Sequence, residues 1–282
     1  MSVQKIAAFS NGNLGGNPAG VLIASSLPSD AEMARIAAEV GFSETVFATP
    51  LSEDKHYRVR YFSPESEVPF CGHATIALGA ALALANGNGV FDLQLNEAKI
   101  TVQGTKTEDG LVAAALQSPP THSHAASEEL IHAALALFGI TSEDLDSSLP
   151  PAIVHGGANH LLLAFKKRET LAAMHYDLEA GRKLMLANGL VTILLVFAET
   201  PHLFHTRNPF ASGGVYEDPA TGAATAALAG YLRDISWPHG GAINIVQGED
   251  MGVPSRLHAD ISDERGSSIR VSGTARIMNE NE

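Results

Sequence analysis

The chain has 282 residues, of which 45% are hydrophobic, enough to fill the cores of about two domains of ordinary size. Its formal net charge of −13 at pH 7 argues against a broad phosphate-binding surface, so we expect no nucleic-acid partner. The single cysteine, Cys71, excludes an internal disulfide, and we expect neither a signal peptide nor a membrane segment, which together favour a cytoplasmic protein.

The first third of the chain predicts strands, a surface helix and a buried helix. Strands are expected at residues 3–9, 20–25, 42–48 and 56–62. Ser29, followed three residues later by Glu32, predicts a capping box at the start of a helix that ends at Val40. Residues 69–85, PFCGHATIALGAALALA, carry no charge after His73. A helix that is apolar on every side must be enclosed by its domain, so this helix is expected to be buried.

The remainder of the chain is also expected to contain both strands and helices. Strands are expected at residues 90–95, 99–103, 111–117, 152–155, 160–165, 190–198, 202–207, 242–247, 255–261 and 268–278. Helices are expected at residues 127–138 and 178–187, and a second uncharged helix at residues 222–232. The sequence SPPT at residues 118–121 is the best linker candidate.

An internal repeat relates the two uncharged helices. Six residues of the first helix recur 150 positions later: Pro69, Gly72, Ala74, Thr75, Ala77 and Leu78 match Pro219, Gly222, Ala224, Thr225, Ala227 and Leu228. The triplet VFA at residues 46–48 recurs at residues 196–198 with the same offset. We therefore predict an α+β fold of two pseudo-symmetric domains, each a β-barrel or roll around one buried helix. The expected domains are residues 1–118, with 268–282 returning to them, and residues 119–267.

Three residues are candidates for acid–base chemistry. Glu44 is expected on a strand with apolar neighbours, where it is either a general base or a side chain at the wet end of the strand. His73 lies in the first turn of the buried helix, where the positive helix end favours a neutral imidazole; its alternative role is a hydrogen bond within its own loop. Asp218 precedes the second buried helix and could equally be its N-cap. Glu217 is expected to be a solvated neighbour.

Other chemistries have weaker support. Cys71 lies beside a helix N-terminus, which can lower the pKa of a thiol, although a buried structural role is the commoner one. The histidine pairs match no metal-binding framework, so we expect no metal. No G-x-S-x-G motif supports a hydrolase.

The repeat suggests where a substrate would bind. If a pseudo-two-fold axis relates the halves, the N-termini of the two buried helices can face each other. Backbone N–H groups of Gly72, His73, Gly222 and Ala223 would then hold a small carboxylate without arginines. With Glu44 beside it, this site predicts proton transfer next to a carboxylate without a cofactor.

Four motifs carry a family resemblance: GGNPAGV at residues 15–21, GFSETVF at 41–47, YFSPESEVPFCGHAT at 61–75 and EDPATGAA at 217–224. With these motifs the chain resembles the phenazine biosynthesis PhzF-like family. The resemblance implies the diaminopimelate-epimerase-like fold, an active site between two domains and a homodimer. It also implies that Glu44 shuttles a proton on a dihydro-hydroxyanthranilate while His73 and Asp218 assist. The implied substrate-binding residues are Asn17, Ser43, Gly72, Gly222 and Ala223.

The chain departs from the family pattern at Ala223, where a serine is frequent, and at residues 207–210. Two alternatives to the isomerase stay open. One is a racemase or epimerase that uses the single thiol of Cys71. The other is a protein that binds a small carboxylate and does not convert it.

Overall fold

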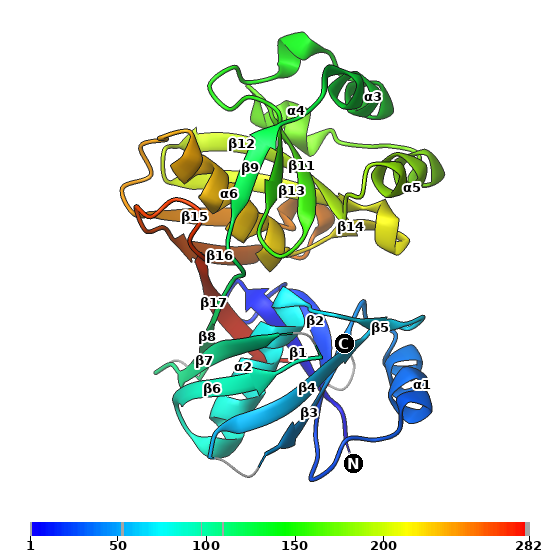
Figure 1. Ribbon diagram of the computed structural model, residues 1–282, viewed down its shortest axis with the longest axis vertical. Helices are drawn as coiled ribbons and strands as arrows, with labels where there is room; N and C mark the ends of the chain where they lie inside the picture. The colour runs from blue at the N-terminus through cyan, green and yellow to red at the C-terminus, as the bar shows by residue number, and fades with distance from the viewer. Residues whose placement is uncertain (1, 52–53, 97, 109, 280–282) are drawn as a thin grey trace. The chain divides into compact units, whose positions relative to one another are not determined.

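The computed structural model describes residues 2–279 except 52–53, 97 and 109 (Figure 1). The chain divides into two compact units. Unit 1 comprises Met1–Gln117 and Ser272–Glu282, and unit 2 comprises Ser118–Val271. Among the described residues, none of the helices has the length and apolar character needed to cross a membrane.

Unit 1 is a closed β-barrel around one helix. Its strands are β1 (Gln4–Ser10), β2 (Asn17–Ile23), β3 (Thr45–Pro50), β4 (His56–Phe62), β5 (Glu67–Val68), β6 (Gly89–Gln94), β7 (Lys99–Lys106), β8 (Val112–Gln117) and β17 (Arg270–Ile277), and its helices are α1 (Asp30–Val40) and α2 (Gly72–Asn86). The strand pairings run β1–β2–β3–β4–β6–β7–β8–β17 and return to β1. Because the ring closes, α2 lies inside it, as Figure 1 shows.

Unit 2 repeats this pattern of pairings. Its strands are β9 (His122–Ala125), β10 (Ala152–His155), β11 (Asn159–Ala164), β12 (Thr192–Thr200), β13 (Leu203–Phe210), β14 (Val215–Asp218), β15 (Ala242–Gln247) and β16 (Ser255–Asp260), and its helices are α3 (Glu128–Phe138), α4 (Arg168–Ala172), α5 (Leu178–Ala187) and α6 (Gly222–Asp234). The succession β10–β11–β12–β13–β15–β16 alternates antiparallel and parallel pairs in the same order as β1–β2–β3–β4–β6–β7. The internal repeat of the sequence is therefore a repeat of topology.

Both buried helices are present, and each begins at the glycine that the repeat aligns, Gly72 and Gly222. Each helix packs directly against the backbone of a glycine in its own unit. A Cβ atom added at Gly104 on β7 would lie 2.3 Å from the carbonyl oxygen of Gly79 on α2. In unit 2, a Cβ atom at Gly156 would lie 2.6 Å from the backbone nitrogen of Ala227 on α6. Glycine is thus required on β7 in unit 1, and in the turn after β10 in unit 2, for the backbone to pack so closely on the helix.

Several expectations for local structure need correction. Glu44 precedes β3 and is not part of it, because the left-handed cap at Gly41 is followed by a bend before the strand starts. The backbone N–H of Glu32 donates to Ser29 as the capping box requires, but the Glu32 carboxylate accepts from Arg35. The sequence reading also omitted β5, β9, β14 and α4, which are short or polar.

Candidate active site

The start of α2 brings together four polar side chains in unit 1. Cys71 is the N-cap of the helix, and His73 lies in its first turn. Nε2 of His73 lies 3.4 Å from Oε2 of Glu44 and 3.5 Å from Oγ of Ser43. On the other side of the ring, Nδ1 of His73 lies 3.3 Å from Sγ of Cys71. Glu44, Cys71 and His73 are all buried, so their charges are little screened by solvent.

A hydrogen-bond chain fixes this helix end. The hydroxyl of Thr75 donates to the carbonyl oxygen of Cys71 at 2.7 Å, and the Tyr61 hydroxyl lies 2.7 Å from the same Thr75 oxygen. Burial raises the pKa of Tyr61, so its hydroxyl stays protonated. The Cys71–Gly72–His73 backbone is therefore held on a neutral, buried support. Its first N–H groups lack helical partners and form a positive end that suits an anion.

In unit 2, the turn before α6 is tied together by its own side chains. Asp218 ends β14, and its Oδ2 accepts a hydrogen bond from the Thr221 hydroxyl at 2.5 Å. Nε2 of the buried Gln247 donates to the carbonyl oxygen of Asp218 at 2.6 Å, and its Oε1 accepts from the Thr221 backbone N–H at 3.1 Å. The alternative that Asp218 is the N-cap of α6 is wrong: the N-cap is Thr221, which makes no side-chain cap.

Glu217 is not solvated, contrary to the expectation from sequence. It is 5% exposed, and its carboxylate accepts from Nε and Nη2 of Arg207 at 2.9 and 2.5 Å. A carboxylate can be buried at this position because Arg207, on the adjacent strand β13, neutralises it with two hydrogen bonds. The pair holds β14 against β13 next to Asp218.

A second buried polar chain reaches the same pair of strands. The Thr192 hydroxyl donates to Oδ1 of Asn208, which lies opposite Asp218 in the β13–β14 pairing. That hydroxyl can then only accept from Nδ1 of His160, 2.7 Å away, so Nδ1 carries the proton. Burial, with a smaller contribution from His155, lowers the pKa of His160 to about 3, which keeps the imidazole neutral.

The predicted site residues thus fall into two groups. Ser43, Glu44, Gly72 and His73 lie together in unit 1, with Cys71 beside them. Asp218, Gly222 and Ala223 belong to the turn and first residues of α6 in unit 2. Asn17 is the first residue of β2 and is buried.

Sequence reasoning missed the residues that support these two helix ends: Tyr61, Thr75, Thr192, Asn208, Thr221 and Gln247. Thr75 could have been found, because it is one of the repeated positions and a threonine inside an apolar helix can bond back to the preceding turn. Tyr61 and Thr221 lie inside two of the four motifs, and the others have no local signal.

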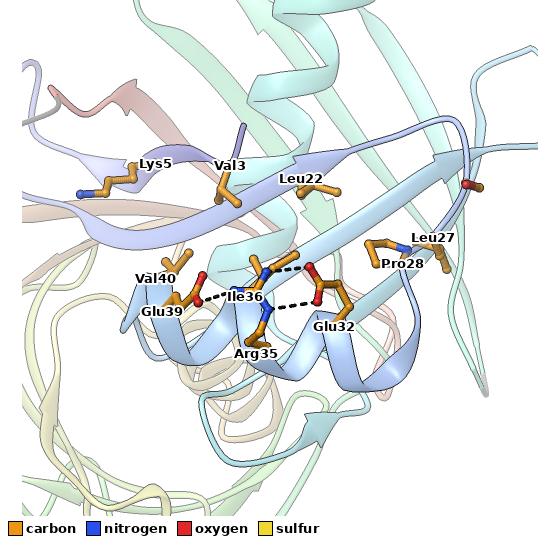
Figure 2. Close-up of a pocket in the computed structure, with 11 residues that line it drawn as sticks. Val3, Lys5, Leu22, Leu27, Pro28, Glu32, Arg35, Ile36, Glu39 and Val40 are labelled. Atoms are coloured by element: carbon orange, nitrogen blue, oxygen red, sulfur yellow. Dashed lines mark hydrogen bonds and ion pairs between the residues drawn. The ribbon is translucent and has the colours of Figure 1, made fainter. Parts of the chain in front are cut away.

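An open groove of unit 1 lies away from this chemistry. It lies between α1 and the first strands, and its apolar side includes Leu22 and Ile36 (Figure 2). Its volume is about 640 Å³. The formal charges of its lining residues balance, because Arg35 bonds both Glu32 and Glu39 and Lys5 supplies the second positive charge. Neither Glu44 nor His73 lines the groove, so we do not place the active site there.

Solved structures share this fold over nearly the whole chain. A phenazine biosynthesis protein of the PhzF family from Bacillus anthracis superposes with a TM-score of 0.84 at 24% identity, covering 98% of this chain and 96% of that one. A probable proline racemase from Agrobacterium radiobacter superposes with a TM-score of 0.67 at 10% identity, covering 98% and 91%. The predicted α+β fold, a helix-centred barrel shared with diaminopimelate-epimerase-like proteins, is confirmed.

Among proteins with this fold, the sequence comparisons assign the chain to one family. The model of the family described as phenazine biosynthesis-like protein matches residues 6–281, and the chain belongs to that family. The trans-2,3-dihydro-3-hydroxyanthranilate isomerase of Pseudomonas aeruginosa is 30% identical over 279 residues, covering 98% of this chain and 96% of the relative. An uncharacterised isomerase of Escherichia coli, YddE, is 29% identical with the same coverage. The chain is therefore an enzyme of the isomerase class.

Proposed function

We propose that this enzyme moves a proton between two carbon atoms of a small carboxylate substrate and uses no cofactor. The observation that carries the proposal is the buried Glu44 carboxylate, whose Oε2 lies 3.4 Å from Nε2 of His73 at the N-terminus of α2. A carboxylate next to an imidazole and a set of free backbone N–H groups can both hold an anionic substrate and exchange a proton with it.

The proposed reaction starts with the substrate carboxylate on the N–H groups at the start of α2. Glu44 removes a proton from a C–H bond, and the electron pair of that bond is delocalised into the adjacent unsaturation. The protonated Glu44 then returns the proton to a different carbon, so that the molecular formula is unchanged and no oxidant is needed. His73 and Asp218 are assigned assisting roles in proton placement.

The substrate class follows from two arguments. The relative from P. aeruginosa is named for trans-2,3-dihydro-3-hydroxyanthranilate, a cyclic amino and hydroxy carboxylate. We extend to this chain the class, and not that particular compound, because Ala223 offers its backbone N–H but no side-chain hydroxyl for a further contact. We also propose a homodimer in the cytoplasm; light scattering on the purified protein tests the oligomeric state.

Proton NMR in deuterated buffer tests the proposal. A panel of cyclic and acyclic amino and hydroxy carboxylates, with trans-2,3-dihydro-3-hydroxyanthranilate among them, is incubated with wild type, Glu44→Gln and Cys71→Ala. We expect isomerisation with deuterium incorporation in wild type and its loss in Glu44→Gln. Conversion that survives Glu44→Gln at the wild-type rate would overturn the assignment of Glu44.

A racemase or epimerase that uses Cys71 is the second candidate. One observation favours it: Sγ of Cys71 lies 3.3 Å from Nδ1 of His73, which could take the thiol proton. In that case Cys71→Ala, and not Glu44→Gln, would abolish exchange. A protein that binds a carboxylate in calorimetry but converts none of the panel would support a binding function.

A further inference from the structure

The start of α2 gathers three donor atoms of different elements. One ligand atom each from Glu44, Cys71 and His73 lies within 4.8 Å of the other two, and all three residues are buried. The proposed proton transfer uses the carboxylate and the imidazole but gives no role to the thiol. Oxygen, nitrogen and sulfur donors in one place are a set that zinc accepts.

The donors of Glu44 and His73 are spaced as in a tetrahedral site, and the thiol of Cys71 lies within reach of them after side-chain rotation. Ligands at about 2.0–2.3 Å from a tetrahedral Zn²⁺ are separated by about 3.3 Å for nitrogen and oxygen and about 3.6 Å for nitrogen and sulfur. In the structure, Nε2 of His73 lies 3.4 Å from Oε2 of Glu44 and 3.9 Å from Sγ of Cys71. Because Sγ lies closer to Nδ1, at 3.3 Å, a common ion requires the Cys71 side chain or the imidazole ring to rotate until one ring nitrogen faces both the carboxylate and the sulfur.

The charges also match. A metal is coordinated by the thiolate form of a cysteine and the neutral form of a histidine. With the Glu44 carboxylate, the three ligands carry two negative charges, which a divalent cation neutralises. A buried site of this kind avoids the cost of an uncompensated charge.

We propose that Glu44, Cys71 and His73 form a binding site for a thiophilic divalent cation, with Zn²⁺ as its representative and a fourth coordination position open. A cation there occupies the carboxylate and imidazole that proton transfer needs, so it inhibits the enzyme. The inhibition rests on the proposed function, whereas the binding does not require turnover.

Titration of the reduced, metal-free, full-length protein with Co²⁺ tests the site. Cys71 is the only cysteine, so a thiolate-to-cobalt charge-transfer band reports on this residue alone, whatever the other histidines bind. We expect the band to saturate at one equivalent and to be displaced by Zn²⁺. Absence of the band in wild type would overturn the proposal, and this result does not depend on whether a substrate is known.

Variants separate a three-ligand site from a lone thiol. Cys71→Ser should abolish the band, and Glu44→Gln and His73→Gln should each weaken affinity by at least about 10–100-fold, the range found for lesser changes around metals. His205→Gln is the matched control, because it removes the imidazole of a histidine–glutamate pair that has no thiol. Wild-type affinity in both Glu44→Gln and His73→Gln, with the fold intact by circular dichroism, would overturn the site.

Metal binding and catalysis can fail independently. A Co²⁺ band without turnover of any panel substrate would keep the metal site and count against the proposed function. Turnover lost in Glu44→Gln, without a Co²⁺ band in wild type, would keep the function and remove the metal site. Zn²⁺ that binds but leaves turnover unchanged would overturn the inhibitory role.

Discussion

Units 1 and 2 repeat one order of strand pairings around one buried helix, yet the two helix starts differ in their chemistry. Before α2, Cys71 and His73 lie beside Glu44, all groups that can gain or lose a proton. Before α6, Thr221 and Gln247 tie the turn at Asp218 with hydrogen bonds. The repeat thus supplies two similar helix N-termini, one beside side chains that can exchange a proton and the other tied by hydrogen bonds. Four predictions test or refine this contrast.

The largest effect is expected on turnover. Glu44→Gln removes the proposed base and should lower kcat by about 10²–10⁴-fold. Gln247→Ala leaves the polar groups of the α6 turn without partners and should act mainly on KM, by about tenfold, since it disturbs position and not proton transfer. Steady-state kinetics on the substrate identified by NMR measures both. Equal losses of kcat would contradict the division of roles between the units.

The free energy of unfolding should fall at acidic pH because of one buried histidine in unit 2, His160. The pKa of His160 is lowered from 6.5 to about 3 in the folded state, so the unfolded chain binds the extra proton first. The contribution of His160 is complete above pH 6.5 and is lost as pH falls from 6.5 to about 3, at up to about 1.4 kcal/mol per pH unit. Urea unfolding from pH 4 to 8 should show a shallower slope in His160→Asn. The exposed His132→Asn is the control, and an unchanged slope in His160→Asn would refute the assignment.

Close packing of helix and strand should cost the same in both units. Gly104→Ala and Gly156→Ala should each lower the free energy of unfolding by about 1–3 kcal/mol, because the new methyl group meets backbone atoms. Hydrogen exchange should rise mainly in unit 1 for the first variant and in unit 2 for the second. Gly89→Ala is the matched control, since its Cβ meets the flexible end of Lys55. Uniform loosening of the whole chain in both variants would mean that the units do not respond separately.

The smallest effect on the free energy of unfolding is expected at the N-caps of α1 and α3. Ser29 accepts from the N–H of Glu32 at the start of α1, and Ser127 accepts from Leu130 at the start of α3. Alanine at either position should lower the free energy of unfolding by about 1 kcal/mol. Turnover should not change, because neither helix carries a proposed catalytic group. A change in kcat in either variant would tie that helix to the site.

Much of the fold is visible in the sequence because its signals are local. The uncharged runs and their repeated glycines locate α2 and α6, and alternating patterns locate β4 and β15. The errors come from contacts between strands that the local pattern does not predict. Glu217 on β14 is buried because Arg207 on the adjacent strand β13 bonds its carboxylate, and the sequence pattern does not predict the hairpin that brings them together.

The candidate site was likewise predictable where its residues have local signals. Glu44 and His73 stand out through their motifs, and the structure brings them together. Gln247 and Asn208 could not be found, since each acts through a bond to a residue from another strand or turn. A polar residue in a strand looks the same in sequence whether it is exposed or ties down a buried turn.

Strand β17 has a consequence for how the protein is made. It follows all of unit 2 in the chain, yet it pairs with β1, for example Ala8 with Ala275, and with β8 to close the barrel of unit 1. On the ribosome, β1 is therefore synthesised before all the strands of β9–β16, and its partner β17 is synthesised after them. Until β17 is made, β1 and β8 each have an edge without its native partner, and such edges can pair with other chains. A premature stop shortly before β17 would yield a complete unit 2 and an unclosed unit 1.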